Sequence, residues 1–475
     1  MIANLRRYPE YKESGLPWLG GIPRHWQTGP GFAAFREKQV KNVGLREKTV
    51  LSLSYGRIVV KPPEKLHGLV PASFETYQIV DPGDIIIRST DLQNDWTSLR
   101  VGIVRNRGII TSAYLCFRTM GSLSPEYGYL LLHAFDLMKV FYGMGSGLRQ
   151  NLDFRDFKRM LIFVPPPDEQ ATIVRFLDWA NGRLERAIRA KRKVIALLNE
   201  QKQAIIHRAV TRGLDPSVAL KPSGIPWLGE IPKHWEEISV GAGTVLIQTG
   251  PFGSQLHSHE YVQGGIPVVN PSHMRDGQIN ADPSVTVSDL KMKELGRHQL
   301  CIGDIVAARR GELGRCAAVT AKEAGWLCGT GSLLIRCKPS VFAPDYFQQV
   351  FSSQGVRDSL SLASVGATMD NLNAGMVARL RLPLPTMEEQ LSILGFVENQ
   401  RRQHADTIAA VEGEIALLRE YRTRLVADVV TGKLDVRAVA QSLPAEAEES
   451  AVVAEVNDRS DENDSETALN EDAHE

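Results

Sequence analysis

A twelve-residue segment occurs twice in this chain. Residues 15–26 read Gly-Leu-Pro-Trp-Leu-Gly-Gly-Ile-Pro-Arg-His-Trp, and residues 224–235, which lie 209 positions later, repeat nine of those twelve residues. A second pair of matching segments begins at Glu169-Gln170 and at Glu389-Gln390, 220 positions apart. A period this long is unsuited to a solenoid, so we predict one unit of about 210 residues that is duplicated in tandem, with pseudo-two-fold character.

Length and composition agree with a pair of folded domains. The chain has 475 residues, of which 43% are hydrophobic, and this is ample for packed cores. It contains no run of 18 apolar residues, and its start lacks the apolar core of a signal peptide, so we expect a cytoplasmic protein. The five cysteines include no Cys-x-x-Cys pair, so we expect reduced, mostly buried thiols and no metal site.

The formal net charge of zero conceals an asymmetry. Residues 441–475 hold twelve Asp or Glu and one Arg, so this tail carries −11 and residues 1–440 carry +11. The tail has no aromatic residue and little apolar surface to bury, so we expect residues 436–475 to form a disordered acidic appendage. The folded part is therefore basic.

Each repeat starts with an arm that is rich in proline and tryptophan. The prolines prevent a continuous helix, and two tryptophans are costly to leave in water, so we expect the arm to dock as an extended latch. His25 and His234 lie beside a tryptophan in a proline-flanked turn. A structural hydrogen bond is the favoured interpretation for both, with a catalytic role as the alternative.

The body of each repeat alternates short apolar runs with turn residues. Gly83-Asp84 and Gly303-Asp304 each open such a run, and short helical pieces are expected around residues 125–142 and 344–360. This pattern predicts an α/β fold of the mixed α+β kind. Between these landmarks the two bodies diverge in sequence, as expected of one framework that carries two sets of loops.

Each repeat ends in a predicted long helix, within residues 168–212 and 388–435. A helix of about 45 residues would be roughly 65 Å long. Apolar residues recur alternately four and three positions apart, which is typical of a coiled-coil seam, so we predict that the two helices pair antiparallel. The alternative is that each helix belongs to a single core. The predicted seam residues are Leu184, Ile188, Ile195, Leu198, Ile205, Ile408, Val411, Ile415, Leu418 and Leu425.

Motifs for catalysis are missing from the chain. It has no phosphate-binding Gly-x-x-x-x-Gly-Lys-Ser/Thr, no His-Glu-x-x-His and no Gly-x-Gly-x-x-Gly between a strand and a helix. The segment Asn270-Pro-Ser-His273 shares only its first two residues with the Asn-Pro-Pro-Tyr motif of amino-methyltransferases. We therefore predict a binding protein without catalytic residues, metal or cofactor.

Polar side chains that can pair with base edges gather in several loops. Arg suits guanine, and Asn or Gln suits adenine, because each can make paired hydrogen bonds to these bases. Similar loops are common on any surface, so each residue is only a candidate. The predicted DNA-binding residues are Arg88, Thr90, Gln93, Asn94, Arg100, Arg149, Gln150, Gln248, Ser254, Asn270, Ser272, Arg309, Arg310 and Thr368.

The arms Pro-Trp-Leu-Gly-x-Ile-Pro-x-His-Trp, the Glu-Gln helix openings and the Val-Thr-x-x-Leu-Asp endings resemble specificity subunits of type I restriction-modification systems. The resemblance spans residues 11–437. It implies a non-catalytic DNA-recognition subunit with two target-recognition domains, residues 1–167 and 213–387, separated by spacer helices.

The resemblance also implies partners. Expected partners are double-stranded DNA, two methyltransferase subunits and the restriction or translocase subunits, with no membrane involved. S-adenosylmethionine, ATP and Mg²⁺ are expected on those subunits and not on this chain. Two alternatives stay open, namely a coiled-coil adaptor that never reads DNA and a self-sufficient enzyme.

Overall fold

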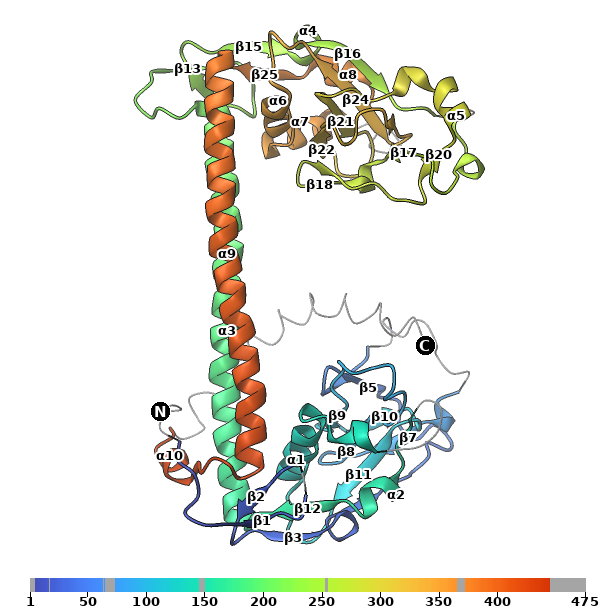
Figure 1. Cartoon of the computed structure of the whole chain (residues 1–475), viewed down its shortest axis with the longest axis vertical. Coiled ribbons are helices and arrows are strands. Elements are labelled where there is room, and N and C mark those ends of the chain that lie inside the picture. Colours follow the sequence, from blue (N-terminus) through green and yellow to red (C-terminus); the bar gives the residue numbers. More distant parts are fainter. Residues whose placement is uncertain are drawn as a thin grey trace. The chain divides into compact units, whose positions relative to one another are not determined.

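The computed structural model describes residues 5–16, 18–62, 64, 73–144, 150–252, 255–364 and 372–444. The chain divides into two compact units. Unit 1 comprises residues 1–191 and 413–475, and unit 2 comprises residues 192–412. Each unit thus contains one body, the start of one long helix and the end of the other (Figure 1).

A four-stranded antiparallel sheet forms the centre of unit 1. Its order is β4 (Phe35–Glu37), β11 (Leu115–Thr119), β8 (Ile85–Ile87) and β9 (Val101–Ile103). All three residues of β8 are fully buried, and helix α1 (Pro125–Leu137) packs on the sheet. The strand predicted after Gly83-Asp84 is therefore confirmed.

The remaining elements of unit 1 surround this sheet. The other strands pair two by two, namely β1 (Tyr11–Glu13) with β2 (Gly21–Pro23), β3 (Gln27–Pro30) with β12 (Leu161–Val164), β5 (Leu51–Ser54) with β6 (Arg57–Val60), and β7 (Gln78–Val80) with β10 (Gly108–Ile110). The short helices are η2 (Gly31–Ala33), η4 (Phe74–Thr76), η5 (Val140–Gly143), α2 (Phe154–Lys158) and α10 (Arg437–Gln441).

Unit 2 repeats the central sheet with the same connectivity. The order is β16 (Thr244–Thr249), β24 (Ser332–Cys337), β21 (Asp304–Ala308) and β22 (Cys316–Ala318), all antiparallel. Strand β21 follows Gly303 as predicted, and α6 (Pro344–Phe351) packs on the sheet where α1 packs in unit 1. Mixed helix and strand content is confirmed, with antiparallel central sheets.

The other elements of unit 2 include one mixed sheet. Its strand order is β20 (Thr286–Val287), β17 (Ile266–Val269) and β23 (Leu327–Cys328), with β17 and β23 parallel. The paired strands are β13 (Leu220–Pro222) with β14 (Glu230–Pro232), β15 (Glu236–Ser239) with β25 (Arg381–Leu384), and β18 (Met274–Arg275) with β19 (Gln278–Ile279). The helices are α4 (Val240–Gly243), η7 (Ser258–Glu260), η8 (Pro271–His273), α5 (Asp289–Glu294), η9 (Gly296–His298), α7 (Gln354–Ser364) and α8 (Ala374–Arg379).

A buried aspartate locks each central sheet. Asp84 is fully buried and accepts hydrogen bonds from Lys38 Nζ at 2.5 Å and Arg118 Nε at 2.8 Å. In unit 2 Asp304 is 1% exposed and accepts two bonds of 2.7 Å from Arg336. Burying a carboxylate is tolerable because it is paired in both units, and this explains why an aspartate opens both central strands.

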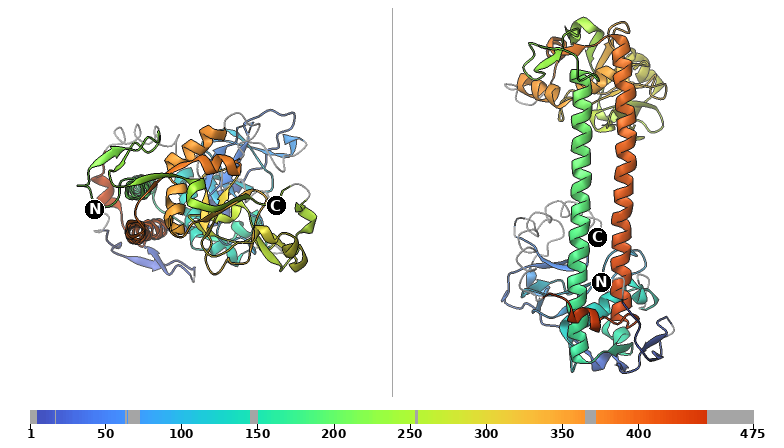
Figure 2. Two further views of the ribbon diagram at one scale, coloured as in Figure 1. Left: turned by 90° about the horizontal axis from the view of Figure 1, so that it is seen from above. Right: turned by 90° about the vertical axis from the view of Figure 1, so that its left-hand side faces the viewer.

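The long helices are α3 (Pro167–Arg212) and α9 (Met387–Val430). Their 46 and 44 residues correspond to about 69 and 66 Å. Each of the ten predicted seam residues is buried or half-buried, and this arrangement fits a coiled coil. Within unit 1 the start of α3 runs antiparallel to the end of α9 (Figure 1, Figure 2), with ion pairs between Glu185 and Arg422 and between Lys191 and Glu414. None of the helices among the described residues combines the length and apolar character needed to cross a lipid bilayer.

A glutamate in the first turn of each long helix holds the arm of the same repeat. In unit 1, His25 Nε2 and Trp26 Nε1 lie 2.7 and 3.0 Å from the carboxylate of Glu169, which also accepts a 2.5 Å bond from Tyr8 Oη. In unit 2, His234 Nε2 and Trp235 Nε1 lie 2.7 and 3.1 Å from Glu389. The structural hydrogen bond predicted for both histidines is confirmed.

The adjacent glutamine ties each long helix to the body. Gln170 accepts from Ser124 N and donates to the carbonyls of Ser122 and Pro165. Gln390 makes the same three bonds with residues 343, 341 and 385. Both glutamines are almost fully buried, so the Glu-Gln pair found in the sequence is a structural joint.

Each arm also packs against the end of a long helix. Trp26 lies beside Gly432 after α9 in unit 1, and Trp235 lies beside Gly213 after α3 in unit 2. Both glycines have positive φ, which suits a helix C-cap. The helix that ends in a unit is therefore the one from the other repeat.

The C-terminal segment differs from expectation. Asp435 N donates to Arg6 O at 2.7 Å, and α10 follows with Val436, Ala440 and Leu443 buried in the core of unit 1. The prediction of a disordered tail from residue 436 is therefore wrong for residues 436–444, because these apolar side chains have a core to enter. Residues 445–475 lie outside the described residues. The burial predicted for most of the cysteines is confirmed, with four buried free thiols and Cys301 exposed.

The joint in unit 2 predicts a defined response to acid. Burial raises the pKa of Glu389, but hydrogen bonds from His234, Trp235 and Thr386 outweigh it and lower that pKa from 4.5 to about 2. Because the folded-state pKa is depressed, the stabilisation is complete above pH 4.5 and is lost as the pH falls toward 2. Thermal unfolding between pH 5 and 2 should therefore show a smaller acid-induced loss in Glu389→Gln than in the wild type. Glu200→Gln, at an exposed position of α3, should follow the wild type.

Candidate nucleic-acid interface

The loop between β8 and β9 carries the largest group of predicted DNA-binding residues in unit 1. It is closed at its base by the bond from Arg88 N to Arg100 O at 2.8 Å. Arg100 itself is fully buried and donates to the carbonyls of Thr90, Asp91 and Asp95 at 2.7, 3.1 and 2.7 Å. One guanidinium therefore fixes the course of the loop from within.

Two other segments support this guanidinium and its loop. Arg100 Nε donates to Tyr142 Oη at 3.1 Å, and Tyr142 Oη donates to Asp95 O at 2.8 Å. Leu152 N donates to Ser89 O at 2.8 Å, which joins the loop to the segment before α2.

A buried carboxylate lies beneath the same loop. Asp136 Oδ2 of α1 accepts a 2.6 Å bond from Arg100 N. Burial raises the pKa of Asp136 to about 6, despite the opposing effects of this bond, Lys139 and Arg100.

Unit 2 has a loop at the equivalent place, between β21 and β22. It is closed by the bond from Ala308 N to Arg315 O at 2.7 Å, and Leu372 N donates to Arg309 O at 2.9 Å. These two bonds match those of Arg88 N and Leu152 N in unit 1. The loop itself is shorter and is held by an ion-pair network in which Glu312 contacts Arg315 and Arg357.

The structure separates the unit 1 candidates into exposed and anchored side chains. Gln93 and Asn94 are exposed, although Asn94 Nδ2 also donates to Asp91 Oδ1 at 2.8 Å, and Thr90 is half-buried. The Arg88 side chain is 22% exposed, with Nη1 3.5 Å from Asp95 Oδ2, and Gln150 Nε2 donates to Tyr142 O and Met144 O. The assignment of Arg100 to DNA contact is wrong, because its side chain is fully buried and its donors are used inside the loop. Arg149 lies outside the described residues.

In unit 2 the candidates divide in the same way. Ser272 and Arg310 are exposed, whereas Asn270 is half-buried at the start of η8. Arg309 is half-buried and donates through Nε to Leu372 O at 3.0 Å. Gln248 is half-buried and bonds to Arg297 O and His298 Nδ1. Ser254 and Thr368 lie outside the described residues.

Three aromatic side chains are absent from the predicted set, namely Trp96 in the β8–β9 loop, Tyr142 in η5 and Phe252 after β16. Trp96 in unit 1 and Phe252 in unit 2 are 55% and 53% exposed, and Tyr142 supports the first of them. An isolated aromatic residue in an otherwise polar stretch was the available signal, since Trp96 follows Gln93-Asn94-Asp95.

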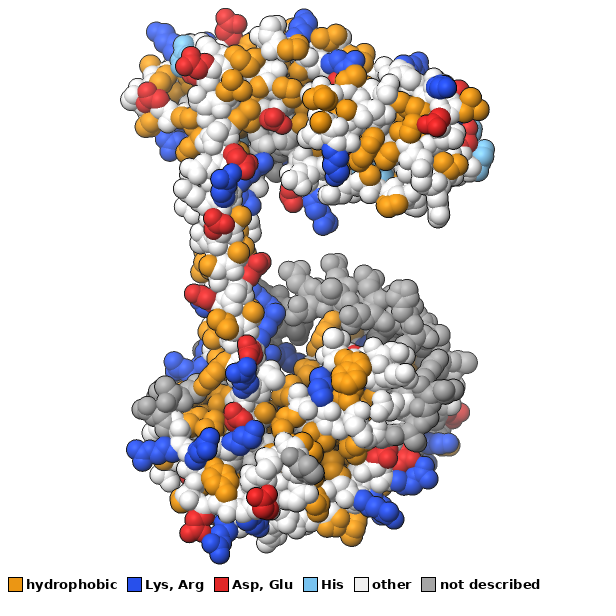
Figure 3. Space-filling view, in the orientation of Figure 1, with side chains coloured by type: hydrophobic (Ala, Val, Ile, Leu, Met, Phe, Trp, Pro, Cys, Tyr) orange, Lys and Arg blue, Asp and Glu red, His pale blue; other side chains and the backbone are white. Residues whose placement is uncertain are grey.

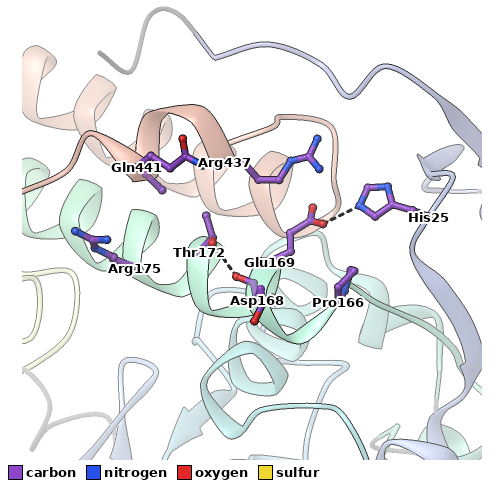
Figure 4. A pocket seen from close by; sticks show the side chains of 9 residues that line it. His25, Pro166, Asp168, Glu169, Thr172, Arg175, Arg437 and Gln441 are labelled. Carbon is purple, nitrogen blue, oxygen red and sulfur yellow. Dashed lines mark hydrogen bonds and ion pairs between the residues drawn. The ribbon is translucent and has the colours of Figure 1, made fainter.

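A separate pocket of about 390 Å³ lies in unit 1 between the arm, α3 and α10 (Figure 4). His25 points to Glu169 there, and Arg437 and Arg175 also line the pocket. Within the part of the chain that the structure describes, no three His, Cys, Asp or Glu residues are grouped to hold a metal ion.

The buried arginine of unit 1 leads to a direct test. Arg100→Leu removes the donors to three loop carbonyls and should loosen residues 89–99. Hydrogen exchange followed by mass spectrometry should show faster exchange in this loop and unchanged exchange in β12. Arg107→Leu is the matched control, because the Arg107 side chain is 58% exposed. Equal protection of the loop in Arg100→Leu and wild type would contradict this role for Arg100.

The known proteins that are similar in sequence to this chain are of one kind. No protein-family model matches the chain. The specificity subunit of the type I restriction enzyme MjaVIII from Methanocaldococcus jannaschii is 22% identical over 370 residues, which cover 74% of this chain and 81% of the relative. The specificity subunit of the type I restriction enzyme StySPI from Salmonella potsdam is 22% identical over 208 residues, which cover 43% of this chain and 44% of the relative.

A solved structure also shares the fold. It comes from work on complex assembly and conformational transition of a type I restriction-modification system, and the alignment has a TM-score of 0.57 at 14% identity. The alignment covers 87% of this chain and 99% of the other. The chain is thus similar in sequence to type I restriction enzyme specificity subunits, as its repeated arms and helix openings predict.

Proposed function

We propose that this chain is the specificity subunit of a type I restriction-modification complex and that units 1 and 2 each read one half of a bipartite DNA sequence. The observation that carries this proposal is the pair of loops after β8 and β21. Both are anchored by matching backbone bonds, yet they differ in length, sequence and internal contacts. Such loops on a common framework can recognise two different sequences.

The exposed members of the candidate set supply the direct readout. Gln93 and Asn94 in unit 1 can pair with adenine edges, and Arg310 in unit 2 can pair with guanine. The charge of +11 on residues 1–440 supports phosphate contacts, which give affinity without sequence preference. In this proposal α3 and α9 set the length of the unspecified gap between the half-sites.

The chemistry belongs to partner subunits in this proposal. Two methyltransferase subunits bring S-adenosylmethionine, and restriction or translocase subunits bring ATP and Mg²⁺. A methyltransferase must turn its target base out of the stack, so it has to share the duplex with the chain that reads the sequence. This chain contributes recognition and docking and carries out no reaction itself.

The long helices offer matching apolar surface for two copies of one partner. Leu198 and Leu418 occupy the predicted seam, whereas their neighbours Leu197 and Leu417 are 52% and 65% exposed. Leu197 and Leu417 correspond to each other in the two repeats. Exposed leucines at repeated positions support docking of two identical subunits.

Substitution of one exposed candidate in each unit tests whether each unit reads only its own half-site. Gln93→Ala should relax one half-site and Arg310→Ala the other, with the gap unchanged. Loss of a bidentate base contact should cost about 1–3 kcal/mol. Methylome sequencing of cells that express the complex reads both half-sites at once. Uniform weakening at every sequence would instead identify phosphate contacts, and loss of specificity in both halves by one substitution would contradict independent reading.

Docking can be tested on the same complex. Leu197→Glu and Leu417→Glu should each reduce the methyltransferase that co-purifies with the chain by about half, because each places a charge in an apolar contact. Gln201→Glu adds a charge at an exposed polar position of α3 and should leave the ratio unchanged. Full recovery of methyltransferase with both leucines replaced would contradict this docking surface.

Two outcomes would favour other functions. An assembled complex without salt-dependent duplex binding would indicate a coiled-coil adaptor. Methyl transfer or cleavage by the purified chain alone would indicate a self-sufficient enzyme.

A further inference from the structure

Trp96 is exposed and yet firmly held. Its ring stacks on Tyr142 with centroids 4.4 Å apart and an interplanar angle of 27°. Its carbonyl accepts a 2.6 Å bond from Lys139 Nζ, and the preceding residue, Asp95, is bonded through its carbonyl to Arg100 and Tyr142. The side chain nevertheless stays 55% exposed.

The polar atom of this indole is already used. Trp96 Nε1 donates to Gln93 O at 3.1 Å, so the exposed part of the ring offers carbon atoms only. Exposed apolar surface that is ordered in advance suits a contact with another molecule, because little conformational entropy is lost on binding. The chemical group that such a ring would recognise is therefore apolar.

The residues around Trp96 indicate which apolar group its ring contacts. Gln93 and Asn94 are exposed on the same turn and can pair with base edges in the major groove, while Lys139 Nζ lies 4.8 Å from the Tyr142 ring centroid. Figure 3 shows basic side chains interspersed with hydrophobic ones on the visible face of unit 1. In the major groove, the apolar group that distinguishes one base pair from the others is the 5-methyl group of thymine.

We propose that Trp96 is a specificity-determining residue of unit 1 and that its exposed ring contacts the 5-methyl group of one thymine in the half-site. This inference rests on the proposed function. Tyr142, Lys139 and the buried Arg100 position the ring and do not touch the DNA.

Unit 2 provides a contrast and a control. Its exposed aromatic residue, Phe252, lies after β16 and not in the hairpin loop, with the Arg309 guanidinium 5.8 Å from its ring centroid. Phe252 should therefore have no influence on the half-site that unit 1 reads. Phe32 in η2, which is 51% exposed, is a second matched control within unit 1.

The test uses the full chain assembled with its methyltransferase subunits and a duplex that carries the sequence found by methylome sequencing. Each thymine of the half-site is replaced singly by deoxyuridine, which removes only the methyl group. For the wild type we expect the methylation rate at low enzyme concentration to fall about fourfold at one thymine of one half-site, as expected for loss of one buried methyl group.

The variants decide whether Trp96 makes this contact. The Trp96→Ala complex should methylate the thymine and deoxyuridine duplexes at equal rates. Trp96→Phe should retain part of the rate difference between the two duplexes. Phe32→Ala and Phe252→Ala should keep the full wild-type difference. An equal deoxyuridine penalty in Trp96→Ala and wild type would overturn the proposal, as would a wild type that is insensitive to every thymine replacement. Failure of the proposed function is distinguishable, because the complex would then methylate no bipartite sequence at all.

Discussion

The carboxylate in the first turn of each long helix is the interaction on which the rest of the structure depends. Glu169 and Glu389 each accept hydrogen bonds from the adjacent His-Trp pair of an arm. A buried tryptophan needs an acceptor for its N–H, and a carboxylate that is buried, as in Glu169, or half-buried, as in Glu389, gains from donors, so each satisfies the other. The neighbouring glutamine binds the body, and two consecutive residues thus join arm, helix and body in both units.

The two glutamates have different additional hydrogen-bond partners. Unit 2 has Thr386, which forms a reciprocal capping box with Glu389. Unit 1 has Pro166 at that place, and Tyr8 Oη binds Glu169 instead. Burial, followed by the bond to Glu169, raises the pKa of Tyr8, so this hydroxyl remains a donor. In unit 1 a backbone hydrogen bond joins residue 435, after α9, to residue 6, before the arm. In unit 2 the corresponding segments, after α3 and before the second arm, are continuous in the chain.

The arms, the central strands and the long helices could be predicted from the sequence because each is determined by a local pattern of residues. The repeated arms, the glycine-aspartate strand openings and the seam spacing each depend on neighbouring residues. The role of Arg100 could not be predicted in this way. Its guanidinium binds Tyr142 and its backbone N–H binds Asp136, and both partners come from later segments of the chain. From the sequence alone, an arginine between Leu99 and Val101 is expected to lie on the surface and to contact a ligand. Residues 436–444 were misjudged for the same reason, since their apolar partners lie in the body of unit 1.

The interactions that hold the β8–β9 and β21–β22 loops determine which of their residues can be replaced without loss of the loop's shape. In unit 1 a buried guanidinium binds the backbone carbonyls of Thr90, Asp91 and Asp95, and these bonds use no side-chain atom of the three residues. The carboxylate of Asp95 adds support through ion pairs with Arg88 and Arg100. In unit 2 the loop is held through the side chains of Glu312 and Arg315, so two residues of this shorter loop are committed to support. Because carbonyl anchoring uses backbone atoms, it leaves side chains such as Gln93 available to face a ligand. A single internal arginine can therefore support a longer loop whose exposed residues vary without loss of its shape.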